Sequence, residues 1–287
     1  MSQHIGPASV DFVKMHGAGN DFIVLDARNS DFPFEEIRRR TPELCHRRTG
    51  IGADGVLMLG NSVDSDFTMH YLNADGSEAG MCGNGSRCLA RFAKDIGLSD
   101  KLVFSVGKQR YEAEVHKNYV SIRFPVKPVP VKKNIDGTKW LEIYTGTEHV
   151  VSIEPRYLKT SETIFRKIGR DIRNRIDLFP AGTNVNFASI LNQNSLKLVT
   201  YERGVEDLTL ACGTGAIATA IAHIFINSSP GTPEEKSGTR EHYIQIECPG
   251  GPLEVSFVHT RSEYESVFDN IVLHGPAVTV YHGRFTL

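Results

Sequence analysis

The chain has 287 residues, 40% of them hydrophobic and 23% charged, and a formal net charge of −2. This length is enough for two domains of ordinary size, and the composition is that of a soluble globular protein. A charge so close to zero gives no indication of binding to nucleic acid or to an anionic membrane surface. No apolar run approaches the roughly 18 residues that cross a bilayer, and residues 1–12 lack the basic and apolar regions of a signal peptide.

The first half of the chain alternates short strands with glycine turns. In residues 10–26, two β-rich runs flank a turn in which Asn20 either tolerates a turn conformation or points its amide at a substrate. This stretch lacks the third glycine and the following helix of a dinucleotide fingerprint. The other elements predicted here are a surface helix at 34–48, strands at 56–59 and 67–72, and a strand–turn–strand with a further strand within 102–124.

In the second half, proline-rich residues 125–133 mark the predicted domain boundary. Residues 228–242 are polar and rich in glycine and proline, so we expect an exposed, mobile loop there. Because helices and strands do not alternate regularly, the predicted fold class is α+β rather than a doubly wound sheet. The expected elements are strands around 140–143, 150–153 and 196–203, a helix at 162–175, a loop and strand at 179–187, and closing strands within 271–287.

The sequence holds five cysteines, an odd number without the paired spacing of a zinc site. This usage favours a reducing compartment, so we predict a cytoplasmic protein with free thiols. Cys45 and Cys88 are expected to be buried in the core. Cys248 lies at the end of a predicted strand, where nothing indicates a catalytic thiol.

The other two cysteines, Cys82 and Cys212, occur in matching glycine turns, Cys-Gly-Asn-Gly and Cys-Gly-Thr-Gly. Each turn precedes an apolar run at helical spacing, so we predict each cysteine at or just before the start of a helix. There, backbone N–H groups and the helix dipole favour anions and activate a thiol. A lone cysteine before a helix is most often a small core residue, but two in matching loops favour a functional role.

The similarity of the two halves extends beyond the cysteines, because a strand, a glycine turn and a strand follow each predicted helix. We interpret this as an internal duplication. Residues 1–126 with 276–287 would form the lobe that carries Cys82, and residues 127–275 the lobe that carries Cys212. Two thiols suit a two-base reaction, in which a thiolate removes a proton from carbon and the opposite thiol delivers one to the other face.

Five stretches resemble the signatures of the diaminopimelate epimerase family and run through nearly the whole chain. They are KMHGAGNDFIVLD at 14–26, GIGADGVL at 50–57, NADGSEAGMCGNGSRC at 73–88, YERGVEDLTLACGTG at 201–215 and CPGGPLEV at 248–255. The resemblance implies an α+β fold of two pseudo-symmetric lobes, each with strands wrapped around a central helix, and an active site in the cleft between them. It further implies a homodimer that interconverts LL- and meso-2,6-diaminopimelate, in lysine and peptidoglycan precursor biosynthesis, without pyridoxal phosphate, another cofactor or a metal.

The resemblance also implies roles for individual residues. Cys82 and Cys212 would exchange the roles of base and acid, and His149 and Glu202 would hold and tune the thiols. The substrate-binding residues implied are Asn20, Asn73, Gly83, Asn84, Asn184, Glu202, Arg203, Gly213 and Thr214. N–H groups at the helix starts suit the reacting carboxylate, and the arginine suits the distal one. From residue types alone, a strand-end histidine, turn asparagines and a surface salt bridge would explain several of these positions as well.

The chain departs from the family pattern around the residues for the distal end. Thr147-Glu148 stands where the family commonly has Asn-Pro, and Leu208 stands where it usually has glutamate. The alternative is therefore a related cysteine-pair racemase acting on histidine, diaminopropionate or a proline-type amino acid. A third reading is a non-catalytic amino-acid-binding or thiol-redox protein. The phenazine-pathway isomerase shares the fold without the cysteine pair, so the two cysteines argue against it.

Overall fold

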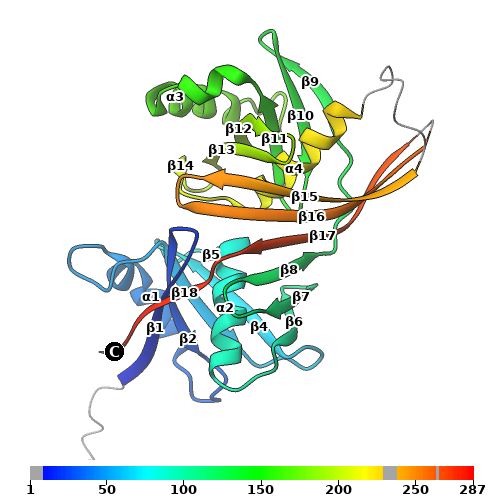
Figure 1. Cartoon of the computed structure of the whole chain (residues 1–287). Helices are drawn as coiled ribbons and strands as arrows, with labels where there is room; N and C mark the ends of the chain where they lie inside the picture. Colours follow the sequence, from blue (N-terminus) through cyan, green and yellow to red (C-terminus); the bar gives the residue numbers. More distant parts are fainter. Residues whose placement is uncertain (1–8, 229–237, 263–264) are drawn as a thin grey trace, which may run out of the picture. The chain divides into compact units, whose positions relative to one another are not determined.

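The computed structural model describes residues 9–228, 238–262 and 265–287 (Figure 1). The structure divides into two compact units. The first consists of the residues up to Ile122 together with Pro276–Leu287, and the second consists of Arg123–Gly275. In the first unit helix α2 (Gly83–Asp95) contacts many of the surrounding strands, and α4 (Gly213–Asn227) does so in the second. The predicted α+β class is thus confirmed. Within the described ranges, no helix is long and apolar enough to cross a membrane.

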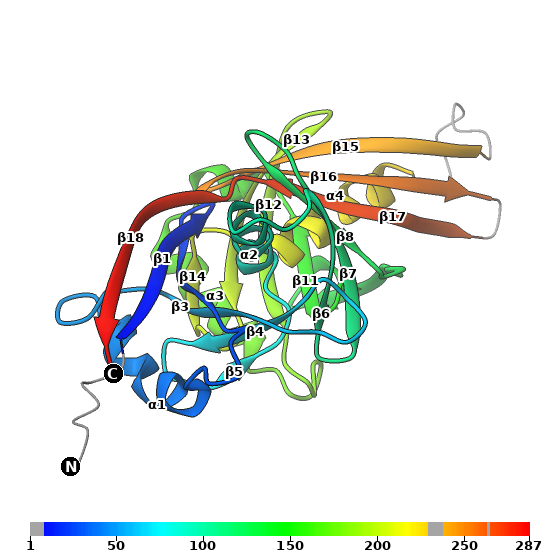
Figure 2. The same cartoon turned by 90° about the horizontal axis from the view of Figure 1, so that it is seen from below.

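In the first unit, strands from both ends of the chain pair with one another. Its remaining elements are β1 (Ser9–Gly17), β2 (Asn20–Asp26), α1 (Phe34–Cys45), β3 (Gly55–Gly60), β4 (Phe67–Asn73), β5 (Glu78–Ala79), β6 (Lys101–Val106), β7 (Gln109–Val115), β8 (Val120–Phe124), which runs over the boundary, and β18 (Val278–Thr286). Strand β1 is antiparallel to both β2 and β18, and Figure 2 shows β1 and β18 side by side. Strand β2 is parallel to β3.

The turn between β1 and β2 determines where Asn20 lies. Ala18 and Gly19 both have positive φ, 53° and 85°. A two-residue hairpin turn of this kind matches the twist of the strands that it joins. The predicted strand–turn–strand is therefore confirmed, and Asn20 becomes the first residue of β2.

The second unit has the remaining elements. They are β9 (Val131–Ile135), β10 (Thr138–Tyr144), β11 (Glu148–Ile153), η1 (Pro155–Lys159), α3 (Glu162–Arg173), β12 (Asn184–Asn192), β13 (Ser195–Glu202), β14 (Asp207–Thr209), β15 (Gly238–Cys248), β16 (Gly251–Arg261) and β17 (Ser266–Gly275). Strand β11 is parallel to β12, which is antiparallel to β13. The helix predicted at 162–175 and the closing strands are confirmed.

The prediction of a loop at 228–242 is wrong for its last residues, 238–242. Residues 229–237 lie outside the described residues, but Gly238 begins β15 and pairs with Arg261 of β16. The first residues of β15 are exposed on both faces of the antiparallel β15–β16 pair. A strand that buries neither face needs no apolar residues, so its polar composition reflected exposure rather than a loop.

The two cysteine-led helices occupy equivalent places in their units. Helix α2 is followed by the antiparallel pair β6–β7, and α4 by the antiparallel pair β15–β16. Both helices are buried along most of their length, since glycine and alanine let the strands approach closely. The predicted repeat of helix, strand, turn and strand is confirmed.

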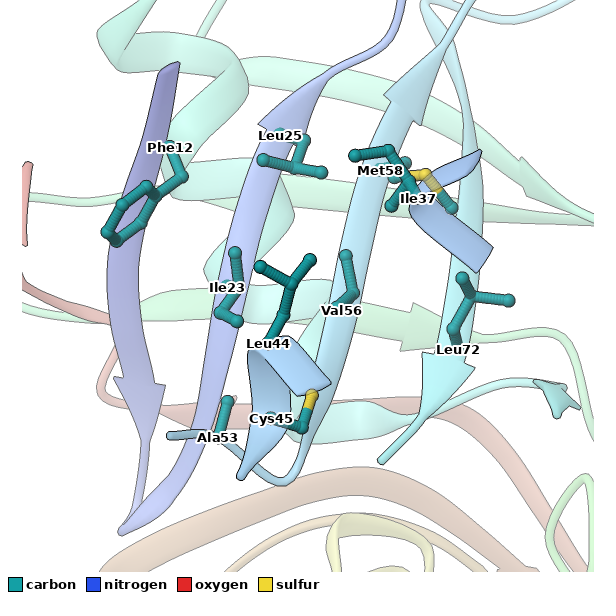
Figure 3. Close-up of a cluster of buried hydrophobic side chains, with 10 residues drawn as sticks. All are labelled: Phe12, Ile23, Leu25, Ile37, Leu44, Cys45, Ala53, Val56, Met58 and Leu72. Carbon is teal, nitrogen blue, oxygen red and sulfur yellow. The ribbon is translucent and has the colours of Figure 1, made fainter. Parts of the chain in front are cut away.

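Two of the five cysteines belong to the core. Cys45, on α1, packs with Leu44 against the strands of the first unit (Figure 3). Cys88 lies on the buried face of α2. Burial raises the pKa of each of these thiols to about 12, so neither ionises near neutral pH. Both were predicted as core residues, which is confirmed.

Candidate active site

Cys82 and Cys212 each occupy the N-cap position of a buried helix. Cys82 has φ −121° and ψ 113°, and Cys212 has φ −120° and ψ 111°. Each Sγ accepts a hydrogen bond from the N–H group three residues later, Gly85 or Gly215, at 3.4 Å. Serine, threonine, asparagine or aspartate usually takes this position. Sulfur here receives a helix N–H group in their place. The predicted helix starts are confirmed.

One asparagine side chain lies beside the sulfur of Cys82, and a second asparagine holds the first. Asn20 Oδ1 accepts a hydrogen bond from Asn84 Nδ2 at 3.4 Å and lies 3.9 Å from Cys82 Sγ. Asn84 is oriented by Arg87, a fully buried side chain whose Nη2 donates to Asn84 Oδ1 at 2.8 Å. Arg87 also donates to the carbonyl oxygen of Gly83 at 3.0 Å. The first turn of α2 is therefore held in one conformation around the thiol.

A cluster of charged side chains fixes the amide of Asn20. Asp54 Oδ2 accepts from Asn20 Nδ2 at 2.6 Å, which turns the amide oxygen toward Cys82. Arg47 donates to both Asp54 and Asp21, at 2.6 and 2.7 Å, and Lys14 pairs with Asp21 at 2.7 Å. Burial raises the pKa of Asp21, but hydrogen bonds from Arg47 and Lys14 outweigh this effect and bring it to about 2. The cluster thus keeps the carboxylate of Asp21 charged and holds the side chain of Asp54 in place.

In the second unit, His149 is fully buried on β11. Its Nδ1 lies 3.0 Å from Asn186 Nδ2, and since an amide NH2 can only donate, Nδ1 is the acceptor and the proton is on Nε2. Nε2 has no hydrogen-bond partner among the described residues. Buried polar groups are almost always paired, so this N–H group is available to a ligand or to a water molecule.

Asn186 connects His149 to the turn of Cys212. Its Oδ1 accepts from Thr200 Oγ1 at 2.9 Å, and its Nδ2 also donates to the carbonyl oxygen of Val150 at 3.0 Å. A Cβ atom built on Gly215 would lie only 2.5 Å from Asn186 Oδ1 and 3.3 Å from Cys212 Sγ. Glycine at this position lets the start of α4 pack directly on the asparagine.

The sequence matches the model of the diaminopimelate epimerase family over residues 12–123 and 142–280. The chain belongs to the diaminopimelate epimerase family. A diaminopimelate epimerase of Chlorobaculum tepidum is 38% identical over 280 residues, which cover 95% of this chain and 100% of the relative. One of Flavobacterium psychrophilum is 38% identical over 270 residues, which cover 93% of this chain and 97% of the relative.

Solved structures share the fold at much lower identity. A hydroxyproline epimerase of Agrobacterium vitis is 14% identical, with a TM-score of 0.68 over 97% of this chain and 91% of that one. A phenazine biosynthesis protein of the PhzF family from Bacillus anthracis is 12% identical, with a TM-score of 0.68 over 98% of this chain and 100% of that one. These likenesses establish the diaminopimelate-epimerase type of fold and say nothing of the substrate.

The residues that the diaminopimelate epimerase resemblance implied fall into local groups. Asn20 and Asn84 lie beside Cys82, while Gly83 is the first residue of α2. Asn73 ends β4, where its Nδ2 donates to Ser77 Oγ at 3.0 Å. In the second unit, Gly213 and Thr214 form the first turn of α4, with Thr214 Oγ1 lying 3.5 Å from Cys212 Sγ.

The remaining implied residues gather at the ends of neighbouring strands. Asn184 begins β12 and contacts the backbone of both Glu148 and Arg203. Glu202 ends β13, opposite Asp207 of β14. The two acidic residues just before Leu208, Glu206 and Asp207, pair with Arg173 and Arg166 of α3.

Sequence reasoning missed two residues that orient this diaminopimelate epimerase-type site. Asp54 lies within the GIGADGVL signature, but a glycine turn gave no indication that its acid would reach Asn20. Asn186 stands two residues after Asn184 on one strand, so alternation already placed the two on one face. That spacing was the available signal for the partner of His149.

The buried His149 makes the stability of the fold depend on pH. Burial, followed by the charge of Arg203, lowers its pKa from the ordinary 6.5 to about 3, against a hydrogen bond from Asn186 that raises it. Between these values the unfolded chain binds a proton that the folded chain does not, so the free energy of unfolding falls as pH drops from 6.5 toward 3.

We therefore expect His149→Gln to lose less stability than the wild type between pH 7 and pH 4.5. Urea denaturation at both pH values measures the difference. His282→Gln, which changes an exposed histidine on β18, serves as the control and should retain the wild-type dependence. The same pH dependence in His149→Gln and the wild type would contradict a neutral, buried ring.

Proposed function

We propose that this chain interconverts LL- and meso-2,6-diaminopimelate by proton transfer at one α-carbon, with Cys82 and Cys212 as the acid–base pair. The observation that carries this proposal is the pair of matching N-cap thiols, each bound by a helix N–H group at 3.4 Å. A binding protein or a single-base enzyme has no need of two such thiols. Membership of the diaminopimelate epimerase family names the substrate.

The reaction follows from the chemistry of the thiols. One thiolate takes the α-proton, an S–H bond forms, and the electron pair of the broken C–H bond remains on the α-carbon and its carboxylate. The other thiol then gives its proton to the opposite face, and its sulfur becomes the thiolate. No net oxidation occurs, and the stereocentre is inverted. In the reverse direction the two cysteines exchange roles.

The weak acidity of the α-proton sets the demand on the rest of the site. Negative charge that builds on the substrate carboxylate must be stabilised by fixed dipoles. The N–H groups in the first turns of α2 and α4, at Gly83, Asn84, Gly213 and Thr214, are suited to this task because four N–H groups at a helix start have no partner in the helix. The Nε2–H group of His149 is a further donor without a partner among the described residues.

The test is proton exchange in D2O, followed by NMR with the purified protein under reducing conditions and LL-diaminopimelate as substrate. Deuterium at one α-carbon together with meso product would support the proposal. Exchange with histidine, diaminopropionate or proline in place of diaminopimelate would assign the same chemistry to another amino acid. No exchange with any of these amino acids would refute the proposal.

Asp54 is expected to act on this reaction through Asn20. Asp54→Asn removes the carboxylate that sets the orientation of the Asn20 amide beside Cys82, so we expect kcat with LL-diaminopimelate to fall about tenfold. Steady-state kinetics on the variant measure this. Asp26→Asn breaks an exposed pair with Arg28 in the same unit and should leave kcat unchanged. Equal kcat values for Asp54→Asn and the wild type would rule out this positioning role.

We also propose that the protein works in the cytoplasm as a homodimer. The family resemblance supports the dimer, and five free cysteines are compatible with a reducing compartment. Sedimentation equilibrium of the purified chain tests the dimer, since a mass of one chain at micromolar concentration would contradict it. Fractionation of the source cells tests the compartment.

A further inference from the structure

The guanidinium group of Arg203 is held in place by several neighbours in the second unit. Its Nη1 donates to the carbonyl oxygens of Ala181 and Gly182, and its Nη2 donates to Thr147 Oγ1 at 3.0 Å. Glu148 Oε2 pairs with Nη1 at 2.8 Å. The arginine therefore has a carboxylate partner within its own chain, supplied by the residue next to His149.

The pairing of Glu148 with Arg203 is built into the strands. Asn184, which is almost fully buried, donates from Nδ2 to the carbonyl oxygen of Glu148 at 2.9 Å and accepts from the backbone N–H group of Arg203 at 2.9 Å. One amide thus fixes the backbone of both charged residues. With the backbone fixed by Asn184 and the side chains held by their own pairing, the two residues lose little additional freedom when they bind a ligand.

Arg203 and Glu148 each keep one polar side-chain atom available to a ligand. Arg203 Nε and Glu148 Oε1 have no hydrogen-bond partner among the described residues, and the two side chains are 30% and 34% exposed. One donor N–H group and one acceptor oxygen of the ion pair therefore remain on side chains that are partly exposed. Asn184 and Thr147 add no net charge, so the local charge of the pair is zero.

This arrangement discriminates between two kinds of ligand. A lone arginine attracts any carboxylate. An arginine paired with a glutamate presents one charge of each sign, which matches an end bearing both a carboxylate and an ammonium group. A carboxylate without an ammonium group gains the arginine but meets repulsion from Glu148.

We propose that Glu148 binds the ammonium group of the non-reacting end of the substrate while Arg203 binds the carboxylate, so that the site selects a zwitterionic end. This inference rests on the proposed function and on the family resemblance, which implies Arg203 for the distal carboxylate. Glu148 is then a residue that determines specificity, and it contacts no reacting atom.

Dissociation constants from calorimetry test the inference with two ligands. LL-diaminopimelate carries both charges at its distal end, and L-2-aminopimelate carries only the carboxylate. Glu148→Gln keeps the shape of the side chain and removes its charge. We expect it to weaken binding of diaminopimelate about tenfold, and to leave binding of aminopimelate unchanged or tighter, since a charged hydrogen bond is lost for the first ligand and a repulsion for the second.

The matched control is Glu142→Gln. Glu142 lies on the adjacent strand β10, pairs with Lys133 at 3.0 Å, and has the same exposed fraction as Glu148, 34%. This variant should bind both ligands as the wild type does. Because a dissociation constant reports affinity and not rate, even for the mixture of LL and meso forms that an active protein produces, the comparison does not depend on the speed of epimerisation.

Three results would overturn the inference: equal weakening of both ligands in Glu148→Gln, tighter binding of diaminopimelate, or no binding of either ligand to the wild type. The first would mean that Glu148 only holds Arg203, and the second that it competes with the substrate carboxylate. Deuterium exchange on the wild type, run in parallel, judges the proposed function separately. Binding of diaminopimelate without exchange would refute the epimerase and leave the specificity test standing.

Discussion

Serine in place of either Cys82 or Cys212 is expected to slow epimerisation at least about a thousandfold in both directions. Inversion requires one group to remove the proton and a second group to supply one, so neither cysteine can compensate for the other. A hydroxyl is far less acidic than a thiol and cannot act as the base near neutral pH. Serine is a good N-cap, so the first turns of α2 and α4 should be retained and the loss is chemical.

Conversion of LL-diaminopimelate to the meso form, followed by NMR, measures these rates, and circular dichroism checks the fold. Cys248→Ser is the control, because this partly exposed cysteine ends β15 with no helix start after it. It should epimerise at the wild-type rate. Wild-type activity in Cys82→Ser or in Cys212→Ser would overturn the two-base mechanism.

The second large effect is expected from a single methyl group at the start of α4. In Gly215→Ala the new Cβ would lie 2.5 Å from Asn186 Oδ1, a contact that the structure must relieve. Asn186 cannot move freely, since it holds His149 Nδ1 at 3.0 Å and Thr200 Oγ1 at 2.9 Å. Cys212 or His149 must then shift, and we expect kcat to fall about a hundredfold, because misplacing a reacting group by about 1 Å has effects of this size.

The internal duplication provides the matched control for this change. Gly85 is the equivalent glycine of α2, and a Cβ there would meet the end of the Leu57 side chain, with Cδ2 at 3.0 Å. Leu57 is buried, but the end of its side chain needs to give by only a few tenths of an ångström, so Gly85→Ala should lose less than about fivefold in kcat. Steady-state kinetics and thermal melts on both variants separate activity from stability. Equal losses in the two variants would contradict the contact with Asn186 as the cause.

The features that the sequence determined by itself are local ones. A cysteine followed by Gly-x-Gly and an apolar run at helical spacing specifies an N-cap and a helix within a few residues, and both starts were predicted at Cys82 and Cys212. The hairpin at Asn20 was likewise encoded in a short glycine turn. The error at residues 238–242 has the same origin, because polarity reports exposure, and an exposed strand looks like a loop.

Only the tertiary structure decided which side chains orient these local features. Asn20 and Asp54 are 34 residues apart, and His149 and Asn186 are 37 apart, so no periodicity within one element relates them. Each pair forms because strands that are distant in the chain lie next to one another, β2 beside β3 and β11 beside β12. The sequence thus established the two thiols and their helices, while the packing of strands fixed the amides, the charges and the Glu148–Arg203 pair around them.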